Sequence, residues 1–207
     1  MAIITGEKMK NTDSLKLIAS AISKLTQPSI LIMLLLVVVL FSEHLLPQLK
    51  SFLICSILLV IVPILSIYLW SKHLGEGHGE ISSNFNRLVP YSISALSFIL
   101  CVIILIFLGN NLTYLFISSS LMVSTILLFL INLFTKVSVH VGGVSLVCGL
   151  SLCLYQLWGL PLFILLALVF WGRSYLNKHT YLQMIFGALI GLVVPFCMYY
   201  LLTSIIL

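Results

Sequence analysis

Residues 112–134, LTYLFISSSLMVSTILLFLINLF, decide the fold class, because this stretch contains no charged side chain. About 20 mostly apolar residues in a helix are enough to cross the hydrocarbon core of a bilayer. The rest of the 207-residue chain has a similar character, since 61% of it is hydrophobic and only 7% is charged. About a quarter of the residues in a soluble domain are charged, so the composition excludes a water-soluble globule. It also excludes intrinsic disorder, which requires low hydrophobicity and high charge.

Apolar runs of this kind recur along the chain and are separated by short polar segments. We expect seven membrane crossings, or six if one segment is re-entrant, at residues 29–46, 51–70, 91–108, 112–134, 140–157, 159–175 and 180–207. The predicted fold is therefore an all-helical integral membrane bundle of six or seven transmembrane helices.

An amphipathic segment, residues 1–27, precedes the predicted transmembrane domain, residues 28–207. Its apolar residues recur near helical spacing, and Lys16 and Lys24 lie off that face. This pattern is typical of a helix that lies on a membrane surface. Pro28 then suits the first position of the next helix. In the last predicted crossing, the GxxxG pair at 187–191 indicates a close approach to another helix.

Positive charge gathers on one side of the predicted bundle. With seven crossings, the segments 1–27, 71–90, 135–139 and 172–179 share a side, and nine of the ten Lys and Arg residues lie in or beside them. The positive-inside rule makes this side cytoplasmic. The net charge of +5 forms no basic stripe, so we expect the lipid bilayer and no nucleic acid as a partner. The predicted location is a prokaryotic inner or cell membrane.

Two polar clusters interrupt the apolar runs at membrane depth, where ionisable side chains are costly and mark functional sites by default. The clusters span residues 135–143 and 172–183, and both share a side with Arg87. Their main polar side chains are Lys136, Ser138, His140, Arg173, His179 and Gln183. Histidines, cations and a hydroxyl group therefore converge at one end of the predicted bundle.

This combination of side chains suits phosphoryl transfer. Arg binds phosphate oxygens with two parallel hydrogen bonds, and Lys acts on them as a point charge. One histidine can attack phosphorus while a second protonates the leaving oxygen. The clusters lack the grouped carboxylates that Mg²⁺ prefers, so we expect neither a metal ion nor another cofactor.

The clusters resemble the type 2 phosphatidic acid phosphatase superfamily, which includes lipid phosphatases and vanadium haloperoxidases. Arg173 and His179 match the Arg-x5-His core of that family's third motif. Ser138 and His140 match the Ser-x-His of its second motif. Arg87 is similar to the arginine of the first motif in a variant branch of the family.

The resemblance covers about residues 71–195 and implies a metal-independent membrane lipid phosphatase that forms a phosphohistidine. It implies that His179 attacks phosphorus, that His140 protonates the leaving group and that Gln183 fixes the tautomer of His179. The residues implied to hold the phosphate oxygens are Arg173, Lys136, Ser138 and Arg87. The substrate stays open among phosphatidic acid, phosphatidylglycerophosphate, sphingoid phosphates and polyprenyl (di)phosphates.

The chain also departs from the family pattern. Glu80 stands where the first motif has a lysine, and Gln183 stands where the third motif closes with an aspartate. Two other functions therefore stay open. One is a catalytically inactive relative that binds or moves lipid, and the other is a small transporter whose Arg and His side chains line a pathway. The oligomeric state is open as well.

Overall fold

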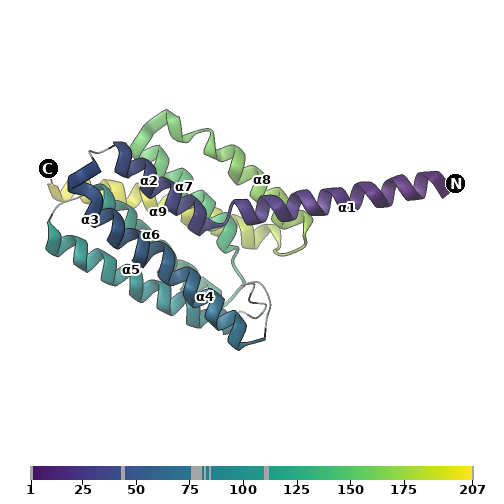
Figure 1. Cartoon of the computed structure of the whole chain (residues 1–207), viewed down its shortest axis with the longest axis horizontal. Helices are drawn as coiled ribbons and strands as arrows, with labels where there is room; N and C mark the ends of the chain where they lie inside the picture. The colour runs from purple at the N-terminus through teal and green to yellow at the C-terminus, as the bar shows by residue number, and fades with distance from the viewer. Residues whose placement is uncertain are drawn as a thin grey trace.

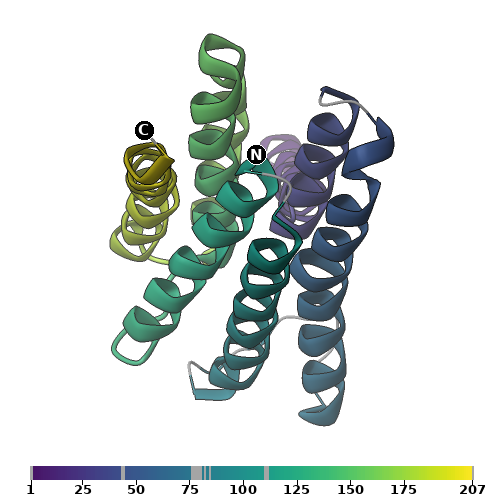
Figure 2. The same cartoon turned by 90° about the vertical axis from the view of Figure 1, so that its left-hand side faces the viewer.

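The computed structural model describes residues 2–42, 45–75, 81, 83, 85–109 and 112–206, and no strand occurs among them. In chain order the helices are α1 (Ala2–Leu25), α2 (Pro28–Ser42), α3 (Leu45–Cys55), a π-helical turn (Ser56–Ile61), α4 (Val62–His73), a 3₁₀ turn (Phe85–Arg87), α5 (Leu88–Leu108), α6 (Leu112–Asn132), α7 (Val139–Tyr155), a second 3₁₀ turn (Gln156–Gly159), α8 (Leu162–Tyr175) and α9 (Tyr181–Ile206) (Figure 1). Helices α3 and α4 lie on the opposite side of the bundle from α9 (Figure 2).

The described residues contain enough apolar helix for a multi-pass membrane protein. Five helical stretches are long and apolar enough to cross a membrane: Gln48–His73, Phe85–Leu108, Leu112–Asn132, Val139–Gly159 and Tyr181–Ser204. A sixth is gained if Ser14–Leu25 and Pro28–Ser42 form one span with a 47° bend. Helix α8 has only 14 residues, which is short for a full crossing. The all-helical fold is confirmed for the described residues, with five or six stretches long and apolar enough to cross a membrane, and seven crossings stay a prediction.

Helix α1 extends beyond the bundle toward the N-terminus, and its C-terminal part packs against α8 (Figure 1). Small side chains make this contact: Ala19 is fully buried, and its carbonyl oxygen would lie 3.4 Å from a Cβ on Gly172. Several larger apolar side chains of α1 are exposed, Leu17 to 73%, whereas Ile22 packs against the core. The location of α1 on a membrane surface stays a prediction.

Helices α7 and α9 run parallel and approach each other through glycines. A Cβ on Gly191 would overlap the carbonyl oxygen of Gly142, and a Cβ on Gly187 would lie 2.7 Å from the carbonyl oxygen of Ser138. The close approach predicted from the GxxxG pair is confirmed. We call this contact the α7–α9 seam.

Hydrogen bonds also cross the α7–α9 seam. The hydroxyl of Ser145 donates to the carbonyl oxygen of Ala188 at 2.6 Å. The backbone N–H of Ser138 donates to the carbonyl oxygen of Gln183 at 3.3 Å. The first turns of α7 and α9 are therefore held together by backbone atoms as well as by packing.

A proline widens the helix that runs through α3 and α4. The N–H of Val62 donates to the carbonyl oxygen of Ile57, five residues back, as in a π-helix. The next residue, Pro63, has no N–H to offer to the carbonyl oxygen of Leu58. The hydroxyl of Ser97 in α5 donates to that oxygen instead, at 2.6 Å. Such side-chain bonds allow proline in helices that lack water around them.

We expect Gly191→Val to destabilise the bundle strongly, because its side chain would overlap the backbone of α7. Overpacking of a tight contact typically costs about 1–3 kcal/mol, and backbone cannot move aside as a side chain can. Thermal unfolding of the detergent-solubilised protein measures the effect. Leu189→Val is the matched control on α9, since Leu189 is 53% exposed. Equal melting temperatures for both variants would contradict the close backbone contact of the α7–α9 seam at Gly191.

Candidate functional site

A cavity of about 620 Å³ lies at the end of the bundle where α2, α5 and α7 begin. It separates α4, α5 and α6 from α2, α7 and the connection between α8 and α9. Basic side chains from five segments line it: Arg87, Lys136, His140, Arg173, Lys178 and His179. Among the described lining residues there is no aspartate or glutamate. We call this hollow the cationic cavity.

Five of the seven predicted site residues line the cationic cavity, whereas Ser138 and Gln183 are not among its lining residues. Ser138 is fully buried and caps α7, with its hydroxyl oxygen accepting a hydrogen bond from the N–H of Val141 at 3.5 Å. The structure therefore places the Ser138 hydroxyl at the start of a helix, away from the cavity wall. Glu80 lies outside the described residues.

Gln183 is held by the N-terminal cap of α9. Its side-chain Oε1 accepts a hydrogen bond from the N–H of Thr180 at 3.2 Å, and its own N–H donates to Oγ1 of Thr180 at 3.4 Å. This reciprocal pair is a capping box, with threonine first and glutamine three residues later. These two hydrogen bonds hold the side chain of Gln183 in place independently of its contact with His179.

The same Oε1 atom of Gln183 lies 3.3 Å from Nδ1 of His179. The N–H of Thr180 can only donate, so the side-chain atom of Gln183 that faces it is the oxygen rather than the nitrogen. An oxygen acceptor requires that Nδ1 of His179 carry the hydrogen. In the neutral ring, Nε2 of His179 consequently carries the lone pair.

The pKa of His179 is lowered from its usual 6.5 to about 4, chiefly by burial and also by the positive charges of the nearby Arg173, Arg87 and Lys136 side chains. The hydrogen bond to Gln183 acts in the opposite sense. At neutral pH the ring of His179 is therefore uncharged. This is the state that a nucleophilic histidine requires.

Arg173 connects the cationic cavity to helix α1. Its side chain is only 5% exposed, and its Nη1 donates to the hydroxyl oxygen of Ser23 at 3.1 Å. The backbone N–H of Lys178 donates to the carbonyl oxygen of Arg173 at 3.1 Å. Sequence reasoning missed Ser23, because no spacing links it to residues so far along the chain. It also left Lys178 out of the site, although Lys178 adjoins His179.

Arg87 is oriented by the segment that precedes α5. Its Nε donates to the carbonyl oxygen of Ile81 at 2.8 Å, and Ile81 is itself buried in the cavity wall. The indole N–H of Trp70 in α4 donates to the carbonyl oxygen of Asn86 at 2.7 Å. These bonds orient the arginine in a cavity that is also lined by His140 of α7 and by His179 of the connection between α8 and α9.

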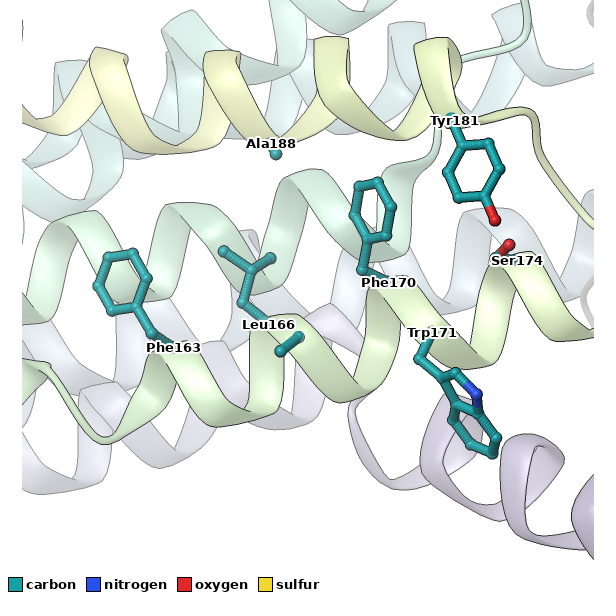
Figure 3. A pocket seen from close by; sticks show the side chains of 8 residues that line it. Phe163, Leu166, Phe170, Trp171, Ser174, Tyr181 and Ala188 are labelled. Carbon is teal, nitrogen blue, oxygen red and sulfur yellow. The ribbon is translucent and has the colours of Figure 1, made fainter.

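A second hollow, of about 590 Å³, lies between α8 and α9. Its wall is largely aromatic and aliphatic, with Phe163, Leu166 and Phe170 pointing from α8 toward α9 (Figure 3). The rings of Phe170 and Tyr181 stack with centroids 6.1 Å apart. None of its described lining residues is a histidine, a cysteine or a charged residue. The chemistry-bearing groups are concentrated in the cationic cavity.

Comparisons with known proteins identify no relative: the chain matches no known protein family, no curated protein and no solved structure. The resemblance to the type 2 phosphatidic acid phosphatases therefore rests on motif spacing alone. In the part of the chain that the structure describes, no three His, Cys, Asp or Glu side chains are grouped closely enough to hold a metal ion. The function has to be inferred from the chemistry of the cationic cavity.

We expect Gln183→Glu to raise the pKa of His179 from about 4 toward its usual 6.5 or above, because a carboxylate stabilises the imidazolium ring. Glutamate also preserves the capping box, so α9 stays in place. Nitrogen NMR of isotope-labelled histidine, followed between pH 4 and 7, measures the change.

The resonance of His179 is assigned by its loss in His179→Asn. Gln183→Leu removes the acceptor and should release the ring into a mixture of both neutral tautomers. If the pKa and the tautomer of His179 are the same in the wild-type protein, Gln183→Glu and Gln183→Leu, Gln183 does not orient the ring.

Proposed function

We propose that the chain is a membrane lipid phosphatase that hydrolyses a lipid phosphomonoester or a polyprenyl (di)phosphate without a metal ion or other cofactor. One observation carries the proposal: four cations and two histidines line one end of a cavity whose other end is apolar. A lipid phosphate has the complementary shape and charge, with an anionic head on an apolar chain. In this proposal the phosphate oxygens lie among the cations and the chain extends into the bundle.

In the first proposed step, the lone pair of Nε2 on His179 attacks phosphorus. The bond from phosphorus to the leaving oxygen breaks, and His140 gives that oxygen a proton, so that a monophosphate releases a lipid alcohol and a diphosphate releases a lipid monophosphate. In the second step, water attacks the phosphohistidine and His140 takes the proton of the water. Inorganic phosphate leaves, and both histidines return to their starting states.

The cations support this reaction through charge. Negative charge on the phosphate oxygens is stabilised by fixed donors that need no rearrangement during the reaction. Arg173, Arg87, Lys136 and Lys178 are in position to supply them. The first turn of α7 adds the positive end of a helix dipole, because Val139 and His140 at its start line the cavity. Ser138 supports the phosphate site by capping this helix.

We further propose that the cationic cavity faces the cytoplasm and that the chain crosses the membrane seven times. Lys16 and Lys24 belong to α1, which packs against α8 and bonds through Ser23 to Arg173 in the cavity wall, so these lysines add positive charge at the cavity end of the bundle and favour a cytoplasmic side. Lipid binding without turnover is the second candidate function. It is favoured by the glutamine at position 183, since an uncharged acceptor stabilises the imidazolium of His179 less than a carboxylate does.

We expect His179→Gln to abolish phosphate release from every substrate, because no other group in the cavity replaces Nε2. His140→Gln should lower the rate on lipid phosphates about 10²–10⁴-fold, the usual value of general acid catalysis. It should cost much less on p-nitrophenyl phosphate, whose leaving group needs little protonation. Release of inorganic phosphate from purified protein, with EDTA present, measures both variants.

His73→Gln is the matched control, since His73 stacks on Trp70 and lies outside the cavity. Full activity of His179→Gln would refute the nucleophile. Loss of wild-type activity on chelation would refute a metal-independent reaction. If the wild-type protein releases no phosphate from any lipid, lipid binding becomes the better description.

A further inference from the structure

The buried face of helix α1 carries small and hydroxyl-bearing side chains. Ala19, Ser23 and Thr26 are 0%, 8% and 5% exposed, and their spacing places them on one face of the helix. The large side chains of Leu17 and Leu25 are 73% and 71% exposed instead. Burial of apolar surface alone would have favoured the leucines for the contact with the bundle, so this contact depends on something more specific.

The face formed by Ala19 and Ser23 lies against the C-terminal end of α8. A Cβ on Gly172 would lie 3.4 Å from the carbonyl oxygen of Ala19, so the two backbones approach closely there. Arg173 follows in the last turn of α8, and its Nη1 donates to the hydroxyl oxygen of Ser23 at 3.1 Å. Polar groups buried without hydrogen bonds are costly, and this bond gives the Ser23 hydroxyl a charged donor.

Ser23 contacts Arg173 from outside the cationic cavity. Arg173 is one of the lining residues of the cavity, whereas Ser23 is not among those described. The backbone of Arg173 is held separately, since its carbonyl oxygen accepts from the N–H of Lys178 at 3.1 Å. The bond to Ser23 therefore acts on the side chain, because it restricts how the guanidinium group can turn on its flexible stem.

The chain just after α1 forms part of the cavity wall, where residues 27–29 are lining residues. There α2 is bent by 47° from the Ser14–Leu25 part of α1. A Cβ on Gly143 of α7 would lie 2.5 Å from two side-chain carbons of Pro28, so the bend packs tightly on α7. This packing fixes the end of α1 at the cavity and keeps Ser23, little more than one turn earlier, beside α8.

We propose that Ser23 is a positioning residue of the anion site: it orients the guanidinium group of Arg173, so that a phosphate meets donors that are already ordered. The inference rests on the proposed function, because it concerns how the same cavity binds phosphate. An arginine side chain has many conformations, and a site gains affinity when that freedom is restricted before the ligand binds. Helix α1 is in this sense part of the phosphate site, although Ser23 itself does not contact the phosphate.

Binding of inorganic phosphate to the detergent-solubilised protein, measured by isothermal titration calorimetry, tests this role without requiring turnover. Ser23→Ala removes only the hydroxyl group and should raise the Kd about tenfold, the value of one hydrogen bond of average strength. Thr26→Val is the matched control on the same buried face, since Oγ1 of Thr26 donates within α1, to the carbonyl oxygen of Ile22 at 2.6 Å. The Kd of this control should equal the wild-type value.

A double-mutant cycle distinguishes positioning from a general structural defect. If Ser23 acts through Arg173, Ser23→Ala should change the Kd of Arg173→Gln by less than about twofold. In turnover of a lipid phosphate, Ser23→Ala should raise KM and leave kcat nearly unchanged, since Arg173 binds the phosphate in the substrate and in the transition state. A structural defect would lower kcat and the melting temperature together.

An unchanged Kd in Ser23→Ala, or an equal rise in Thr26→Val, would overturn the role of Ser23 while the phosphatase proposal stands. The same conclusion follows if Ser23→Ala weakens binding as strongly in Arg173→Gln as in the wild-type protein, or if it lowers kcat at unchanged KM. If the wild-type protein binds phosphate but releases none from any lipid, the phosphatase proposal fails and the Kd values still decide the role of Ser23. A wild-type protein that binds no phosphate overturns both proposals.

Discussion

Backbone contact between α7 and α9 is the constraint on which the rest of the site depends. Glycine at positions 142, 187 and 191 removes the side chains that would hold the two helices apart. Once the backbones meet, the first turn of α7 and the residues just before α9 must lie side by side. His140 and His179, which are far apart in the sequence, therefore border the same cavity. The capping box of α9 then orients one of the two rings.

The positive charge of its lining residues makes the cationic cavity suited to binding an anion. Four cations share a wall whose described residues include no carboxylate, at the end of a bundle that is otherwise apolar. A phosphate bound among these side chains would be stabilised by their positive charges. Burial, together with the positive charges of Arg173, Arg87 and Lys136, keeps His179 uncharged at neutral pH. The charges that would bind the substrate therefore also prepare the proposed nucleophile.

Sequence reasoning predicted the features of the structure that depend on local sequence patterns. Apolar runs predicted the helical membrane bundle, the GxxxG pair predicted the close helix approach, and motif spacing predicted that Arg173 and His179 belong together. The hydrogen bond between Ser23 and Arg173 joins residues 150 positions apart, so the periodicity of apolar residues cannot predict it. The hydroxyl group of Tyr91 is buried where α5 packs against α6, and no local sequence pattern predicts that contact.

The α7–α9 seam has a consequence for how the protein responds to its membrane. Helices adapt to a thinner bilayer by tilting, and two helices in backbone contact can tilt only as one body. Helix α5, which borders the opposite side of the cavity, is joined to its neighbours through side chains and can tilt separately. We therefore expect a change in bilayer thickness to alter the distance from Arg87 to the histidines more than the distance between His140 and His179. Lipid composition would act on substrate affinity, while the spacing of the reacting groups stays constant.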